Sequence, residues 1–221
     1  MKIDKILNSF KQFGLLGFIS RAIRRIGRIV GVEYEDYYLL SLTLRDYELS
    51  NNTIVVEGVE TRRLSNEDFI KSYESHNYLM LSPPKIQLIN ERFSERYEAF
   101  GAFYNGELIY ASWISYSRLE IPGAEERSLL SEGNALLLDD FCAPHMRQKG
   151  IHGLVNLMRL KALKENNVQR VIVTVMCVNK PALKSHIKNG FAVVFKYYTL
   201  RIIGEFYSNL NINLNKYGYS R

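Results

Sequence analysis

The stretch Asn134-Ala-Leu-Leu-Leu-Asp-Asp-Phe-Cys-Ala-Pro-His-Met-Arg-Gln-Lys-Gly-Ile-His-Gly-Leu-Val-Asn156 decides the fold. An apolar run ends at Pro144, a basic turn with glycines follows, and apolar residues then recur at helical spacing from Ile151. This order predicts a strand, a turn and the start of a helix. The first amides of a helix have no acceptor within it, and glycines let a ligand approach the backbone. The turn therefore predicts a phosphate or pyrophosphate site; the alternative is a basic connection without a ligand.

A second stretch, residues 171–191, repeats the order of strand and helix. It opens with an apolar run that predicts a buried strand. Asn179 then suits the N-cap of a helix, and Gly190 suits its C-terminal stop. The helix between them carries His186 on the stripe that should face inward.

Together the two stretches resemble the GNAT superfamily of acetyl-CoA-dependent N-acetyltransferases. The phosphate turn of that family reads Arg-x-x-Gly-x-Gly/Ala, and its following strand and helix read Asn-x-x-Ala-x-x-x-Tyr-x-x-x-Gly-Phe. The matching positions are Arg147, Gly150, Asn179, Ala182, Gly190 and Phe191. The chain departs from the family at His152, where a small residue is usual, and at His186, which stands in the position of the tyrosine. The resemblance covers residues 53–203.

The resemblance implies an α/β (α+β) protein with the GNAT fold, a mixed, mostly antiparallel sheet flanked by helices. It implies a domain over residues 51–221, preceded by a helical extension and connector over residues 1–50. The implied reaction is direct acetyl transfer from acetyl-CoA to a small-molecule primary amine in a ternary complex, without a metal. The helix Asn179–Gly190 and the aromatic strand Phe195–Arg201 also resemble, more weakly, the sugar-nucleotide amine acetyltransferases of bacterial surface-polysaccharide pathways, the dTDP-fucosamine acetyltransferases among them. This second resemblance implies an amino-sugar acceptor. Peptides and small metabolites remain open as acceptors.

The resemblance also implies which residues bind acetyl-CoA, mostly through their backbone amides. The pantetheine arm would lie along the end of the central strand, at Phe141, Cys142 and Ala143. The remaining cofactor-binding positions are those of the phosphate turn and the second helix start: Arg147, Gln148, Lys149, Gly150, Ile151, His152, Gly153 and Asn179.

Catalytic candidates follow from what amide formation requires, a base for the amine and an acid for the departing thiolate. His186 is the candidate acid, and a histidine packed in the core is the alternative. Strand alternation sends Asp139 and Asp140 to opposite faces, so one of them should face the cleft as the base. Glu132 in the preceding loop is the third candidate, and a surface or ion-paired role is the alternative for each.

Cysteine chemistry is not expected at this site. Cys142 lies within the apolar strand with no base adjacent in sequence, which argues against a covalent nucleophile. Cys142 and His145 have zinc-ligand spacing, but the sequence holds no second matching pair, so we expect no metal.

The chain has 221 residues and a net charge of +6, and residues 1–30 carry all of that excess. Apolar residues recur in this segment at near-helical spacing, which predicts a basic amphipathic helix. We favour a helix that covers the core or a dimer partner, and peripheral contact with the inner face of a membrane is the alternative. The positive charge is the one feature in favour of nucleic-acid binding, so we expect no nucleic-acid partner. Two cysteines in apolar runs and no membrane-length or signal-like segment predict a cytoplasmic protein.

The other expected elements follow from turn and capping signals. Residues 32–52 predict a connector with one short strand, and Ser65 with Asp68 predicts a helix start. A helical pattern over 67–96 is broken by Ser82-Pro83-Pro84. The predicted strands are 53–63, 98–104 and 107–116 joined by Asn105-Gly106, 191–203, and an edge strand over 209–215. A different class of function is also open, a non-catalytic module that binds acyl-CoA or docks on a membrane.

Overall fold

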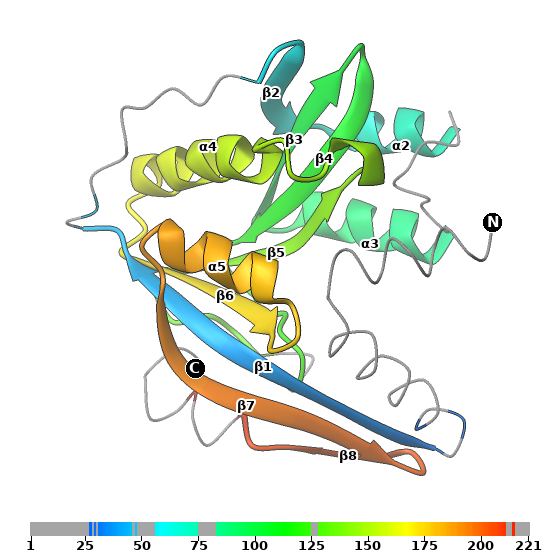
Figure 1. Ribbon diagram of the computed structural model, residues 1–221, viewed down its shortest axis with the longest axis vertical. Helices are drawn as coiled ribbons and strands as arrows, with labels where there is room; N and C mark the ends of the chain where they lie inside the picture. The colour runs from blue at the N-terminus through cyan, green and yellow to red at the C-terminus, as the bar shows by residue number, and fades with distance from the viewer. Residues whose placement is uncertain are drawn as a thin grey trace. The chain divides into compact units, whose positions relative to one another are not determined.

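A computed structural model describes residues 27, 29, 31–45, 47, 56–74, 83–124, 128–210 and 214 (Figure 1). The chain divides into two compact units. Unit 1 comprises Met1–Leu42, Ile121–Ser128 and Ile172–Arg221, and unit 2 comprises Thr43–Glu120 and Leu129–Val171. The helix predicted for the N-terminal segment, and the domain boundary placed at residue 50, lie outside the described residues.

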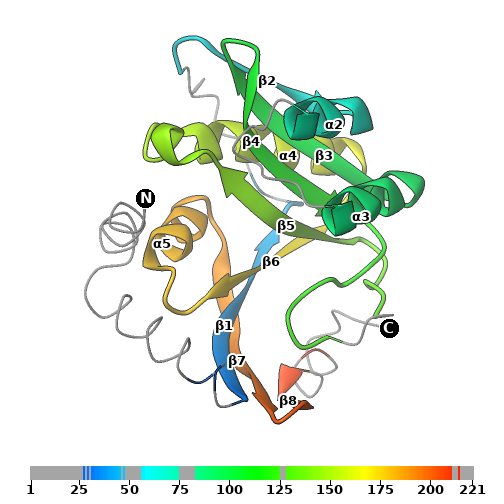
Figure 2. The same ribbon diagram turned by 90° about the vertical axis from the view of Figure 1, so that its right-hand side faces the viewer.

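Unit 2 is a layered arrangement of antiparallel strands and helices. Its strands are neighbours in the order β2 (Val59–Leu64), β3 (Tyr97–Tyr104), β4 (Glu107–Ser115) and β5 (Asn134–Cys142). Its helices are α2 (Asn66–Glu74), α3 (Pro83–Ser94) and α4 (Ile151–Glu165). Figure 2 shows α2 and α3 on one face of these strands and α4 on the other. Helices on both faces explain why β4 is buried at nearly every position.

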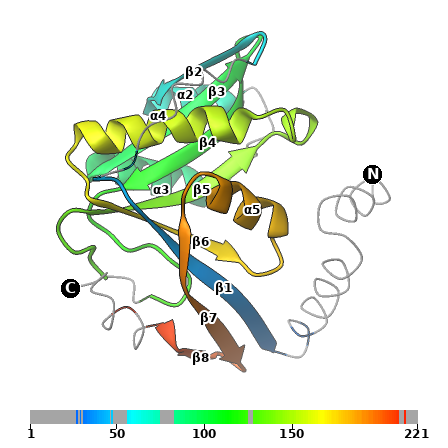
Figure 3. The ribbon, with the colours of Figure 1, turned by 60° about the vertical axis from the view of Figure 1, so that its left-hand side comes forward.

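Unit 1 contains the long strands of the chain. Its strands are neighbours in the order β6 (Arg170–Met176), β1 (Val32–Thr43), β7 (Ala192–Ile202) and β8 (Glu205–Ser208). β1 pairs antiparallel with β7, and β7 with β8 (Figure 3). Helix α5 (Lys180–Lys188) follows β6. The two units together give the mixed α/β fold of mostly antiparallel strands that the sequence predicts.

In unit 2 the structure confirms the predictions that rest on local turn and capping residues. Asn105 and Gly106 adopt φ values of 50° and 78°, as a two-residue hairpin between β3 and β4 requires. The backbone N–H of Ser65 donates to the Asp68 carboxylate over 2.8 Å at the start of α2, half of a capping box. Pro83 opens α3, where the missing N–H does no harm.

Three strand predictions are corrected. Residues 32–43 form a twelve-residue strand rather than a connector, because β1 is covered along part of both faces and shows little alternation. The strand predicted from residue 53 begins only at Val59, after a turn in which Gly58 has a φ of 69°.

The predicted edge strand over 209–215 is also wrong in the part that the structure describes. The edge strand is β8, and Leu210 is helical. The side chain of Asn209 accepts the N–H of Tyr198 over 2.9 Å, so it takes the bond that a continuing strand would have made. Residues 211–213 lie outside the described residues.

Gly101 is tightly enclosed in the middle of β3. A Cβ at this position would lie 2.7 Å from the carbonyl oxygen of Tyr110 and 2.7 Å from Leu64 Cδ2. A backbone oxygen cannot move aside, so we expect Gly101→Ala to lower the free energy of unfolding by about 1–3 kcal/mol. Urea unfolding measures this change, with the exposed Glu107→Ala on β4 as control. Equal stability of the two variants would contradict the packing described for β3.

Candidate functional site

The turn between β5 and α4 is built to present backbone amides. After β5, a short 3₁₀ helix at Pro144–Met146 leads into Gln148 and Gly150, whose φ values are 66° and 82°. Gly150 is the N-cap of α4, and no side chain caps the helix. The first intrahelical bond runs from Leu154 N–H to the Gly150 carbonyl over 3.2 Å. The amides of the first turn therefore lie at an uncapped, electropositive helix end.

Two basic side chains lie along this turn, which we call the phosphate turn (residues 147–153). Arg147 Nε donates to the carbonyl oxygen of Cys142 over 3.2 Å, which ties the turn to the end of β5. Lys149 Nζ lies 3.6 Å from the sulfur of Met146. The buried side chain of Ile151 anchors the helix start. The turn thus combines fixed amides with two positive charges, the combination expected of a diphosphate site.

The end of β5 offers fewer amides than the sequence predicts. Ala143 N–H donates to the Ile109 carbonyl of β4 over 2.8 Å, so it is not available to a pantetheine arm. Phe141 lies two residues earlier, opposite Ala111, and its amide also faces β4 in this register. Of the three predicted amides, that of Cys142 is the one that points away from β4.

A β-bulge interrupts β5 just before this point. Ala111 lies opposite Phe141 and Trp113 lies opposite Leu138, so two aspartates of β5 share one partner on β4. Asp139 has a φ of 53°, which lies in the left-handed region that non-glycine residues rarely adopt. The two consecutive carboxylates face helices on opposite sides of the strands, the arrangement that strand alternation predicts.

Asp139 pairs with a buried arginine of α3. Arg92 Nη1 lies 2.7 Å from Asp139 Oδ2, and Arg92 Nη2 lies 2.6 Å from Glu120 Oε2. Burial alone would lower the pKa of Arg92, but Asp139 and Glu120 outweigh it and raise the pKa. Burial, with a hydrogen bond to Glu120, also raises the pKa of Tyr97. The Asp139 side chain is 59% exposed, so Arg92 fixes a carboxylate that solvent or a ligand can reach.

Asp140 pairs with a second buried arginine on the opposite face. The guanidinium of Arg159 is fully buried and donates to both Asp140 oxygens, over 2.6 and 3.2 Å. Arg159 also donates to Asn156 Oδ1 over 3.2 Å. Burial alone would lower the pKa of Arg159, but Asp140 raises it, so the arginine stays charged. Both oxygens of Asp140 are therefore held by a structural ion pair.

His152, the departure from the family's small residue, belongs to the same buried network. Its Nδ1 lies 2.8 Å from the hydroxyl of Tyr110 and 3.4 Å from Asp140 Oδ2. Burial lowers the pKa of His152, although Asp140 acts against it. Burial also raises the pKa of Tyr110 well above its usual value. The side chain of His152 thus packs toward Asp140 and Tyr110, whereas its backbone remains in the phosphate turn.

The structure bears on two more residues of unit 2 that the sequence analysis discussed, Glu132 and Cys142. Glu132 lies before the first residue of β5, and the strand from Asn134 to Cys142 is roughly 26 Å long at the usual rise, so Glu132 is remote from the phosphate turn. Glu132 is therefore withdrawn as a candidate base. Burial raises the pKa of the Cys142 thiol, and Arg147 opposes this only in part. The thiol is protonated at neutral pH, which agrees with the prediction that it is no nucleophile.

Unit 1 contains the predicted residues of the second motif. Asn179 caps α5, and its side chain accepts the N–H of Ala182 over 3.4 Å. His186 faces inward as predicted, because its side chain is 3% exposed and lies edge-on to the Phe191 ring, with centroids 5.1 Å apart. The role of His186 as an acid stays a prediction.

Sequence reasoning missed both arginines and their aromatic neighbours. Arg159 had a signal, because it lies among the apolar positions of α4, where Val155 and Ala162 are buried. No such sequence signal distinguishes Arg92 from the exposed charged residues of α3. Pairing with a carboxylate distant in sequence is visible only in three dimensions.

We expect the loss of one partner of the Asp140–Arg159 ion pair to lower stability more than the loss of both. Asp140→Asn leaves a buried positive charge without its partner and should lower the free energy of unfolding by about 3–5 kcal/mol. The double variant Asp140→Leu/Arg159→Leu removes both charges and should be more stable than Asp140→Asn alone. Urea unfolding of the three proteins measures this. A double variant less stable than Asp140→Asn would contradict this expectation.

His152 should make stability depend on pH on the acid side. Its folded-state pKa lies below the unfolded value of about 6.5, so the unfolded chain binds the proton more readily. Its stabilising contribution is therefore present above about pH 6.5 and is lost as the pH falls through the folded-state pKa. The difference in unfolding free energy between the wild type and His152→Gln should shrink from pH 7 to pH 5, with His145→Gln as control. A difference that grows on acidification would refute the assignment.

Solved structures provide the comparison with known proteins. A tandem GNAT protein from the clavulanic acid biosynthesis pathway has a TM-score of 0.56 at 15% identity, over 79% of this chain and 53% of that one. A putative GNAT-family acetyltransferase from Novosphingobium aromaticivorans has a TM-score of 0.52 at 11% identity, over 77% of this chain and 66% of that one. A GCN5-related N-acetyltransferase from Sphaerobacter thermophilus has a TM-score of 0.51 at 13% identity, over 84% and 57%.

No protein-family model and no curated protein matches the chain. The chain spans between about half and two thirds of the length of the three solved structures. In the part of the chain that the structure describes, none of the helices has the length and apolar character needed to cross a bilayer. At this level of identity the matches show the fold alone, and that fold is the GNAT fold.

Proposed function

We propose that the protein is an N-acetyltransferase that moves an acetyl group from acetyl-CoA to a primary amine. The observation that carries the proposal is the uncapped start of α4, preceded by left-handed Gln148 and Gly150 and by two basic side chains. The GNAT fold supports it, and the sequence of this turn resembles the family's phosphate turn. The identities of the acyl donor and of the amine acceptor are separate proposals.

The donor set at the turn suits the pyrophosphate of acetyl-CoA. Amides of the first helical turn would donate to the phosphate oxygens, and Arg147 and Lys149 would add positive charge. Gly150 has a positive φ, so a side chain there would strain the turn where the diphosphate must approach. The amide of Cys142 faces away from β4 and would hold the pantetheine arm.

Asp139 is the proposed base. It accepts a proton from the acceptor ammonium, directly or through water, and the neutral amine attacks the thioester carbonyl. The tetrahedral intermediate then collapses: the C–S bond breaks, the nitrogen releases its second proton to solvent, and the departing thiolate takes up a proton. Asp140 is the weaker candidate because Arg159 holds both of its oxygens. Arg92 would hold the exposed Asp139 carboxylate in place.

His186 is proposed as the acid for the thiolate, on the strength of its match to the family's tyrosine. A thiol is already a good leaving group, so this proton is a modest part of the barrier. Removing His186 should therefore slow turnover less than removing Asp139.

For the acceptor, we propose an amino-sugar nucleotide as the first class to test. The support is the resemblance of the helix Asn179–Gly190 and the aromatic strand after it to sugar-nucleotide amine acetyltransferases. Peptide amines and small polyamines are the other outcomes of the same assay. A protein that binds acetyl-CoA but transfers nothing would be the non-catalytic module.

We expect acetyl-CoA to release its thiol in the presence of one acceptor class, above a control without acceptor. Amino-sugar nucleotides, polyamines and peptides are offered in parallel, and thiol is followed colorimetrically. Asp139→Asn should lower kcat/KM by a factor of about 10²–10⁴, the usual contribution of a general base, with acetyl-CoA binding unchanged. Glu107→Gln, an exposed carboxylate on β4, is the matched control.

Three results separate the alternatives. If thiol release is unchanged in Asp139→Asn, Asp139 is not the base, but the proposed reaction stands. Binding of acetyl-CoA without release to any acceptor would favour the non-catalytic module. Absence of acetyl-CoA binding would overturn the proposed function altogether.

A further inference from the structure

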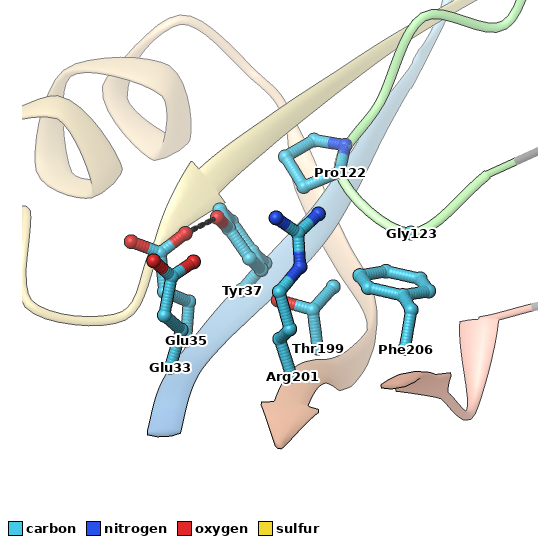
Figure 4. A pocket seen from close by; sticks show the side chains of 8 residues that line it. All are labelled: Glu33, Glu35, Tyr37, Pro122, Gly123, Thr199, Arg201 and Phe206. Atoms are coloured by element: carbon cyan, nitrogen blue, oxygen red, sulfur yellow. Dashed lines mark hydrogen bonds between the residues drawn. The ribbon is translucent and has the colours of Figure 1, made fainter. Parts of the chain in front are cut away.

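Unit 1 contains a pocket of about 170 Å³ that the proposed reaction does not use. It lies between β1, β7, β8 and the turn that starts at Ile121 (Figure 4). A cavity of this size is large enough to take up a molecule as large as benzene.

Strand register builds the floor of this pocket from neighbouring side chains. Arg201 lies opposite Glu33 on β1 and opposite Phe206 on β8, and Thr199 lies opposite Glu35. Side chains directly opposite one another share a face of the sheet, so all five point to the same side. A single antiparallel register therefore sets two carboxylates, one guanidinium, one hydroxyl and one ring around the same space.

The wall of the pocket is a turn that only glycine allows. Gly123 has a φ of 89°, and a Cβ there would lie 2.7 Å from Ser208 Oγ and 3.0 Å from Thr199 Cγ2. The turn is closed by a bond of 3.1 Å from Ala124 N–H to the Ile121 carbonyl. The glycine thus fixes how closely this turn approaches β7 and β8.

Charges of both signs line the pocket. Figure 4 shows Glu33 and Glu35 on one side of Arg201 and Phe206 on the other. The Tyr37 hydroxyl donates to Glu35, which orients that carboxylate. In the described part of the chain Arg201 enters no ion pair, and its guanidinium lies 5.9 Å from the centre of the Phe206 ring. A cation is thus held beside two carboxylates in a small, partly apolar space.

We propose that this pocket binds a small zwitterion, an α-amino acid with a short side chain. Its carboxylate would pair with the Arg201 guanidinium, and its ammonium would face Glu33 and Glu35. A simple anion would meet two carboxylates and a simple cation would meet Arg201, so a ligand with both charges fits better than either. Thr199 Oγ1 adds a donor and acceptor on the floor, and the Phe206 ring borders a short apolar side chain.

Two-dimensional amide NMR of the full chain, without acetyl-CoA, tests this. L-alanine should shift the amide signals of Gly123, Thr199 and Arg201 in a saturable way. Acetate and ethylamine, which each carry one of the two charges, should bind at least tenfold more weakly. Arg201→Gln should weaken alanine binding at least tenfold, because it removes a charge-assisted contact. Lys196→Gln changes a cation on the opposite face of β7, which pairs with Asp36, and should leave binding unchanged.

Several results would overturn the proposal. Absence of saturable shifts with alanine in the wild type would do so without any variant. So would equal binding of acetate, ethylamine and alanine, or equal loss in the Arg201 and Lys196 variants. If Arg201→Gln does not fold, the three wild-type titrations still decide the question. Acetyl transfer does not enter this assay, so its result is independent of the proposed function.

Discussion

The structure of unit 2 depends on the pairing of two buried arginines with two consecutive aspartates. The side chains of Arg92 and Arg159 are 6% and 0% exposed, and a charge so deeply buried needs an opposite charge beside it. β5 supplies these charges, because Asp139 faces α3 and Asp140 faces α4. It thereby ties a helix on each face to the same point of the strand. β5 then ends at Cys142 and the short 3₁₀ helix leads to the phosphate turn at Arg147, so the ion pairs lie just ahead of the turn in sequence.

The same arrangement separates structural from chemical roles among similar residues. Asp140 is held at both oxygens by Arg159 and has His152 nearby, so it contributes to stability. Asp139 is held by one arginine and remains mostly exposed, so it is the carboxylate with access to an acceptor. His152 stands where the GNAT motif has a small residue, and its ring packs toward Tyr110. This contact explains how a histidine is accommodated at that position.

The sequence predicted the features that neighbouring residues determine. The strand, turn and helix around Gly150, the hairpin at Asn105-Gly106 and the cap at Asn179 all follow from local backbone chemistry. Features that need partners distant in sequence were not predictable. Neither the bulge at Asp139 nor the burial of Arg92 leaves a periodic signal, and the length of β1 was hidden because both of its faces are partly covered. The strand, turn and helix of the candidate site were therefore predicted, and the ion pairs beside them were missed.

The central claim is that the phosphate turn binds the pyrophosphate of acetyl-CoA. Isothermal titration of the full chain with acetyl-CoA and with acetyl-pantetheine, which has the same thioester and arm but no pyrophosphate, tests it most directly. The account predicts that acetyl-CoA binds and that acetyl-pantetheine loses most of the affinity, because amides and basic side chains of the turn then have no partner. Equal affinities would contradict the account, since the binding energy would come from elsewhere in the chain.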